Sequence, residues 1–122
     1  NYNYSTLFLK ILPGIMEKDF KSFAEGIQLI QSNMSEIFYK NSKKFSSKNI
    51  SYIFDYLRNK KITGFGQSSW GPTGFIFCEN SKKRNQLLNS IEKYITLKKL
   101  NGVNLVKING RNKGKFLTKD NL

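Results

Sequence analysis

Apolar residues in the first part of the chain recur at helical spacing. Residues 6–16 carry Leu7 and Ile11 four positions apart, which predicts a first helix that Pro13 and Gly14 kink or split. Asp19 can cap a second, longer helix. The apolar positions of this long helix recur every three or four residues and predict one continuous buried stripe: Phe20, Phe23, Ala24, Ile27, Ile30, Met34, Ile37 and Phe38.

The pattern changes twice in the middle of the chain. Residues 40–48 are polar and aperiodic, which predicts a loop, and Ser46 or Ser47 can cap a third helix. The apolar stripe of that helix consists of Ile50, Ile53, Phe54 and Leu57. Residues 61–66 and 74–78 then predict two short strands, close enough in sequence to pair in antiparallel fashion.

The C-terminal part predicts one more helix and further strands. Ser81 can cap a fourth helix, Gly102 marks a turn, and residues 103–108 alternate as a strand, with a short last strand at residues 116–117. The apolar positions of the fourth helix are Leu87, Leu88, Ile91 and Ile95. This order predicts an α+β fold, with helices packed on one face of a small, mostly antiparallel sheet. Residues 1–122 are expected to form a single domain, because this length supports one compact core but not two.

Composition narrows the classes of function. The formal net charge is +13, but the lysines are spread along the chain instead of clustered, so we expect no nucleic-acid partner. We also expect no membrane association, because no uncharged apolar run is long enough to span a bilayer. Cys78 is the single cysteine and lies in an apolar run, which predicts a buried thiol and fits a cytoplasmic location. The chain has no histidine, and the sequence identifies neither a catalytic residue nor a metal ligand.

One segment, residues 64–74, has the composition of a binding loop. Its glycines are Gly64, Gly66, Gly71 and Gly74, and its polar side chains are those of Gln67, Ser68, Ser69 and Thr73. Glycines allow backbone N–H groups to approach an anion closely, and the polar groups can hold phosphate or hydroxyl oxygens. The segment has no carboxylate or amine for acid–base chemistry.

Neither common phosphate-binding motif fits this segment. A strand follows it where both motifs need a helix, and Pro72 stands where a P-loop has lysine. Two interpretations therefore stay open from the residues alone. The segment is either a ligand-binding loop or a tight turn on which Trp70 packs as a lid over the core.

A family resemblance lies in the same segment. It closely resembles, over Gly66-Gln67-Ser68-Ser69-Trp70-Gly71-Pro72-Thr73-Gly74, the third motif of beta-ribofuranosylaminobenzene 5'-phosphate synthases. These are GHMP-superfamily proteins that act in tetrahydromethanopterin synthesis. Weaker similarities are Leu12-Pro13 followed by Asp19-Phe20, and Gly110-Arg111-Asn112 near the C-terminus. One departure is Asn41-Ser42-Lys43-Lys44, where the family tends to carry a glycine-rich stretch.

The resemblance implies a ferredoxin-like GHMP C-terminal domain. It also implies an N-terminal domain with the main phosphate loop, which residues 1–122 lack. The implied reaction transfers phosphoribose from phosphoribosyl pyrophosphate to a benzoate, with loss of carbon dioxide and pyrophosphate. Mg²⁺ is the implied cofactor, and this domain is not expected to bind it alone. The chain by itself is expected to be inactive. Its expected partners are the two substrates, the N-terminal domain and, in a homodimer, a second copy.

Substrate contacts are expected in the glycine-rich segment and in the C-terminal turn. The residues are Gly64, Gly66, Gln67, Ser68, Ser69, Trp70, Gly71, Thr73, Arg111 and Asn112. Arg111 can pair with a phosphate or with the benzoate carboxylate, or it is a solvated turn residue. Two other functions remain open: the C-terminal half of a GHMP small-molecule kinase using ATP, and a free-standing basic module that binds nucleic acid.

Overall fold

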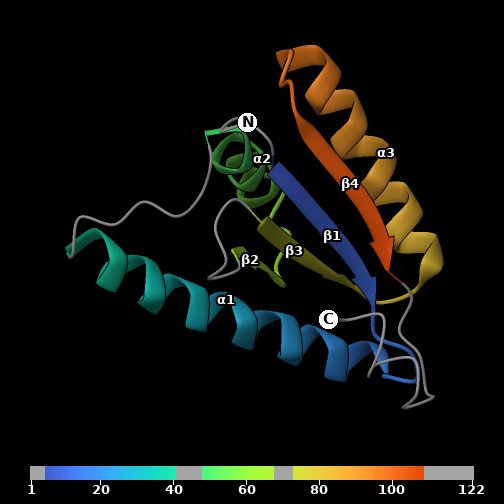
Figure 1. The fold of residues 1–122 in the computed structure, drawn as a ribbon. Helices are drawn as coiled ribbons and strands as arrows, with labels where there is room; N and C mark the ends of the chain where they lie inside the picture. The colour runs from blue at the N-terminus through green and yellow to red at the C-terminus, as the bar shows by residue number, and fades with distance from the viewer. Residues whose placement is uncertain (1–4, 41–47, 68–72, 109–122) are drawn as a thin grey trace, which may run out of the picture.

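The described part of the chain folds into one four-stranded sheet and three helices (Figure 1). The computed structural model describes residues 5–40, 48–67 and 73–108, with the backbone alone for residues 34–40. The elements in chain order are β1 (Ser5–Ile11), α1 (Glu17–Lys40), α2 (Lys48–Asn59), β2 (Phe65–Gln67), β3 (Thr73–Cys78), α3 (Ser81–Lys98) and β4 (Val103–Ile108).

The first element is a strand, so the helix predicted over residues 6–16 is wrong. In β1 every second residue is buried, including Leu7 and Leu9, while the residues between them are partly exposed. A central strand between two parallel neighbours is apolar on both faces, and a short apolar run of this kind cannot be told from a buried helix by periodicity. Gly14, with φ of +73°, lies in the turn that follows.

The sheet is mixed, with strand order β2-β3-β1-β4. β1 pairs in parallel with both β3 and β4, and the β2–β3 hairpin alone is antiparallel. The prediction of a mostly antiparallel sheet is therefore corrected, while the predicted hairpin is confirmed. Two helices separate β1 from β2, so β2 runs opposite to β1 and the hairpin returns β3 parallel to β1. β3, α3 and β4 then form a split βαβ unit with β1 between its strands.

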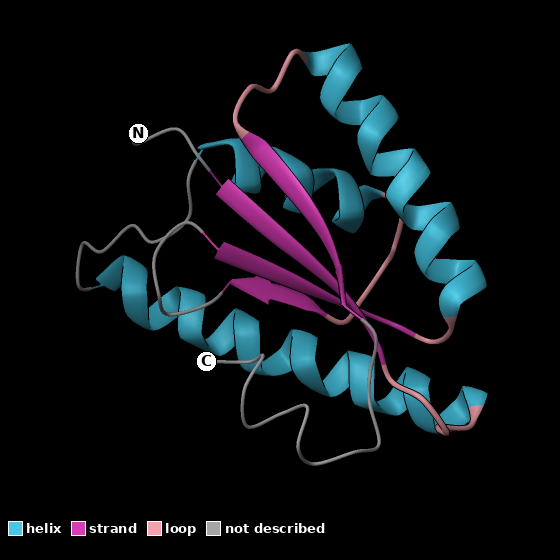
Figure 2. Cartoon of the chain, turned by 45° about the vertical axis from the view of Figure 1, so that its right-hand side comes forward, coloured by secondary structure: helices cyan, strands magenta, loops and turns pink. Residues whose placement is uncertain are grey.

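The main core lies between one face of the sheet and the helices α2 and α3 (Figure 2). The predicted stripe of α2 is confirmed, because all four of its apolar residues are buried. The buried residues of this core are Leu7, Leu9, Ile50, Ile53, Phe54, Leu57, Phe65, Ile76, Cys78, Ile91 and Leu100. Two of the three helices thus pack on one face, as predicted.

Helix α1 lies apart from the other two and runs beside β2 (Figures 1 and 2). Ala24 is buried and the Phe23 ring meets the Phe77 ring edge-on, with centroids 5.1 Å apart. The predicted stripe is only partly confirmed, because its member Ile30 is 55% exposed. The neighbouring Leu29, which is not part of the stripe, is 66% exposed. The side chains predicted for the stripe beyond residue 33 lie outside the described part. α1 is therefore an edge helix with one uncovered face.

The ends of the other elements differ from prediction by a few residues. Asn80, not Ser81, caps α3, and its Oδ1 accepts a hydrogen bond from the backbone N–H of Lys83 at 2.9 Å. The first hairpin strand begins at Phe65 instead of residue 61, because Lys61 has φ of +60° in the turn after α2. The predicted caps at residues 46 and 47 and the predicted last strand lie outside the described residues.

Candidate functional site

The glycine-rich segment forms the β2–β3 hairpin. Gly64, Gly66 and Gln67 lie in or next to β2, and Thr73 and Gly74 begin β3. The tip, with Ser68, Ser69, Trp70, Gly71 and Pro72, lies outside the described residues, as do Arg111 and Asn112. The structure thus brings four of the predicted site residues, Gly64, Gly66, Gln67 and Thr73, together with Gly74 in or next to two paired strands.

Three glycines of the hairpin are required by close packing. A Cβ atom on Gly74 would lie 3.0 Å from Leu7 Cδ1 and 3.2 Å from Phe54 Cζ. Gly64 has φ of +94°, and a Cβ there would lie 3.1 Å from the Cβ of Ala24. A Cβ on Gly66 would overlap the side chain of Gln31. Tight contacts with α1, α2 and β1 therefore explain these glycines without a ligand.

Two glutamines of α1 hold the outer edge of β2. Gln28 Oε1 accepts hydrogen bonds from the backbone N–H groups of Gly64 (2.7 Å) and Phe65 (3.3 Å), and Gln28 Nε2 donates to the Phe65 carbonyl (3.2 Å). Gln31 Oε1 accepts from the N–H of Gln67 at 3.0 Å. An edge strand otherwise leaves these backbone groups open to pairing with another chain. Neither glutamine was predicted from the sequence as a functional residue, although their spacing of three puts them on one side of a helix.

Gln67 carries the unusual polar group of the hairpin. Its side-chain Nε2 is buried and has no hydrogen-bond partner among the residues that the structure describes. Because Gln67 is in register with Gly74, its side chain lies on the face of the sheet that α2 covers. A buried amide donor without a partner costs about 1 to 3 kcal/mol, and such a group in a native structure calls for an explanation. Among the described residues of the glycine-rich segment, Gln67 is therefore the one whose presence is least explained by packing.

The thiol of Cys78 is buried at the end of β3, as predicted. Burial raises the pKa of Cys78 to about 11, and the nearby Arg84 guanidinium opposes this rise. The Arg84 side chain is itself buried and donates to the carbonyl of Ile108 at 3.4 Å. A thiol with a raised pKa is protonated at neutral pH, so it is a poor nucleophile.

The described residues show neither a metal cluster nor a membrane span. Across residues 5–40, 48–67 and 73–108, no three His, Cys, Asp or Glu side chains group together in a way that could hold a metal ion. None of the described helices is long and apolar enough to cross a bilayer.

Comparison with known proteins places the chain in a family. The family model described as GHMP kinases C terminal matches residues 11–96, which is more than half of the chain. No curated protein and no solved structure gives a match. The α+β architecture, with three helices and a mixed four-stranded sheet, is consistent with such a domain. The chain therefore belongs to the GHMP kinase C-terminal domain family.

Proposed function

We propose that this chain is the C-terminal domain of an enzyme similar to beta-ribofuranosylaminobenzene 5'-phosphate synthases. In this proposal the β2–β3 hairpin contributes to binding of phosphoribosyl pyrophosphate, and the reaction joins its phosphoribosyl group to a benzoate. The family assignment supports a GHMP-type enzyme. The synthase, as opposed to another member of the superfamily, is supported by the motif from Gly66 to Gly74, which resembles that of the synthases.

The observation that carries a binding role for the hairpin is the amide of Gln67. Packing accounts for Gly64, Gly66 and Gly74, so the glycines give no independent support for a ligand. The Nε2 of Gln67 has no hydrogen-bond partner within residues 5–40, 48–67 and 73–108, and Gln67 is followed in the sequence by the hydroxyl residues Ser68 and Ser69. We infer that this N–H group donates to an oxygen of the phosphorylated sugar once the hairpin meets its ligand. A bound acceptor would offset the cost of burying the amide.

This domain is proposed to bind and orient, not to supply acid–base catalysis. The chain has no histidine, and the one described cysteine is held protonated by burial. Because the described residues do not form a metal cluster, the proposal contains no step through Mg²⁺. The purified chain alone should not condense 4-aminobenzoate or 4-hydroxybenzoate with phosphoribosyl pyrophosphate. Turnover above the uncatalysed rate would contradict this division of labour.

The binding role is tested with the variant Gln67→Met, which keeps the length of the side chain and removes its donor. We expect the affinity for phosphoribosyl pyrophosphate, measured by titration calorimetry, to fall by roughly 2- to 13-fold, which corresponds to about 0.5 to 1.5 kcal/mol for one neutral hydrogen bond. The melting temperature should stay the same or rise, because an unpaired buried amide is removed. Unchanged affinity with a raised melting temperature would show that Gln67 has no ligand role.

A second candidate is the C-terminal half of a GHMP kinase that uses ATP, and the description of the matched family favours it. The segment from Gln67 to Pro72 argues for the synthase, because kinases of the superfamily usually carry a more glycine-rich third motif. The same titration with ATP in place of phosphoribosyl pyrophosphate distinguishes the two candidate functions, because the kinase should bind ATP and the synthase should bind phosphoribosyl pyrophosphate. In the longer enzyme, Ser69→Ala should weaken use of phosphoribosyl pyrophosphate by about 0.5 to 1.5 kcal/mol without lowering the melting temperature.

A further inference from the structure

The backbone N–H of Gln67, the last residue of β2, points away from the sheet. The N–H of Phe77 donates to the carbonyl of Gly64 at 2.9 Å, which makes these two residues a hydrogen-bonded pair of the antiparallel ladder. Hydrogen-bonded and non-hydrogen-bonded pairs alternate along such a ladder, so the pair of Gln67 and Gly74 is of the second type. Because β2 is an edge strand, the N–H of Gln67 then faces the helix α1 and not β3.

Gln31 of α1 meets this N–H group. Its Oε1 accepts the hydrogen bond from the N–H of Gln67 at 3.0 Å, in a partly buried position. The Gln31 side chain reaches that point by lying across Gly66, since a Cβ atom on Gly66 would overlap the Cγ, Cδ and Oε1 atoms of Gln31. The missing side chain of Gly66 thus provides the space through which Gln31 reaches the end of β2.

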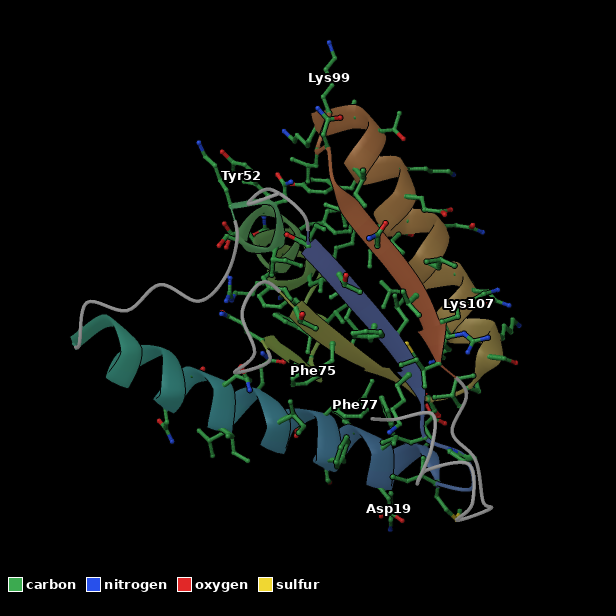
Figure 3. The ribbon with its side chains drawn as sticks, viewed as in Figure 1. Asp19, Tyr52, Phe75, Phe77, Lys99 and Lys107 are labelled. Atoms are coloured by element: carbon green, nitrogen blue, oxygen red, sulfur yellow. The ribbon has the colours of Figure 1, made fainter. Side chains whose placement is uncertain are left out.

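Aromatic packing holds α1 on the same side of the hairpin. Phe75 is the cross-strand partner of Gly66, and Figure 3 shows Phe75 and Phe77 on the side of β3 that is turned toward α1. The centroid of the Phe77 ring lies 5.3 Å from that of Phe75 and 5.1 Å from that of Phe23 on α1. The ring contact at Phe23 and the hydrogen bond at Gln31 therefore attach α1 to the hairpin at two separate points.

The hydrogen bond from Gln31 acts on Gln67 through the backbone. The Gln67 side chain leaves the strand on the opposite face, which α2 covers, because Gln67 is in register with Gly74. A fixed backbone N–H limits the position of the Cα atom and hence the direction in which the side-chain amide points. A group that binds a ligand must be held within about 0.5 Å of its productive position, and neighbouring residues supply that constraint.

We infer that Gln31 is a positioning residue, which sets the place of the Gln67 side chain by anchoring the backbone N–H of the same residue. This inference rests on the proposed function, because it takes the Gln67 amide as the group that meets the phosphorylated sugar. Gln31 itself does not touch the sugar in this arrangement. Its removal can therefore cost no more affinity than removal of the Gln67 amide does.

The first measurement needs no ligand. Amide hydrogen exchange of the 122-residue chain is followed by nuclear magnetic resonance for wild type and for Gln31→Met, which keeps the length of the side chain and removes its acceptor oxygen. The Gln67 amide should exchange roughly 2- to 13-fold faster in the variant, as expected for loss of one neutral hydrogen bond. Amides of β1 should keep their wild-type rates. Gln31→Glu keeps the acceptor oxygen and should restore slow exchange at Gln67.

The second measurement is titration calorimetry with phosphoribosyl pyrophosphate. Gln31→Met should weaken binding by at most the factor that Gln67→Met does. The double variant should bind no more weakly than Gln67→Met alone, because the two residues act through the same amide. The matched control is Gln28→Met, which removes the contacts of α1 to Gly64 and Phe65 and leaves the contact to Gln67. This control should lower the melting temperature without weakening binding.

The outcomes separate this inference from the proposed function. An unchanged exchange rate of the Gln67 amide in Gln31→Met would overturn the inference. It would also be overturned if Gln67→Met weakens binding while Gln31→Met does not, or if Gln28→Met weakens binding as much as Gln31→Met. A wild-type chain that does not bind phosphoribosyl pyrophosphate would overturn the proposed function instead, and the exchange rates would still decide whether Gln31 positions Gln67.

Discussion

The hydrogen bonds from Gln28 to the edge strand allow a quantitative test of how α1 is attached. Gln28→Ala removes the acceptor of the Gly64 N–H at 2.7 Å and the donor to the Phe65 carbonyl at 3.2 Å. Each neutral hydrogen bond contributes about 0.5 to 1.5 kcal/mol, and partial burial lets water replace part of it. We therefore expect a loss of about 1 to 2 kcal/mol of unfolding free energy, or roughly 4 to 8 °C in melting temperature.

The assay is urea unfolding followed by circular dichroism, with Gln86→Ala as the matched control. Gln86 is exposed on α3, so this control carries the same gain in helix propensity without the edge contacts. Gln28→Glu keeps the acceptor for Gly64 but loses the donor to Phe65, and its stability should lie between those of wild type and Gln28→Ala. If the free energies of unfolding of the two alanine variants agree within about 0.5 kcal/mol, the reasoning is refuted. Water would then hydrogen-bond the backbone groups at the outer edge of β2 as well as Gln28 does.

Three further predictions test other parts of the fold. Gly66→Val should lower the free energy of unfolding by about 1 to 3 kcal/mol, because the valine side chain would meet Gln31. Gly26→Ala, in open space on α1, should raise the free energy of unfolding by roughly 1 kcal/mol. Equal effects of the two variants in thermal melts would contradict this packing argument. Because burial raises the pKa of Cys78, the unfolded thiol ionises near pH 9 while the folded thiol stays protonated until about pH 11. The contribution of this thiol to the free energy of unfolding is therefore fully present below pH 9 and is lost as the pH rises to 11. Between pH 9 and pH 11 the free energy of unfolding of Cys78→Ala should fall less steeply with pH than that of wild type. An unchanged slope would contradict this prediction. The positive charge should not confer tight nucleic-acid binding, and submicromolar, steeply salt-dependent binding to duplex DNA in a gel-shift assay would show the opposite.

Local periodicity alone was enough to predict most of the elements. The stripe of α2 is set by which side of the helix must be buried, and this information is carried by neighbouring residues. β4 is a strand as predicted, although its burial does not alternate along the strand. The β2–β3 hairpin follows from two short strands joined by few residues. The burial of Cys78 follows from its apolar neighbours. The glycine-rich segment was recognisable in the sequence, and the match to the GHMP family agrees with the superfamily that it indicated.

The tertiary structure decided the identity of β1, the direction of the sheet and the role of the glycines. Leu7 and Leu9 belong to a strand only because parallel neighbours on both sides satisfy its backbone, and no local pattern contains that pairing. Gly64 and Gly66 proved to be contact positions because Ala24 and Gln31, more than thirty residues earlier, pack against them. The burial of the Gln67 amide, which lacks a hydrogen-bond partner among the described residues, likewise appears only when distant segments meet. The sequence determines which residues are apolar and favour burial. Which residues they pack against depends on long-range contacts that exist only in the folded chain.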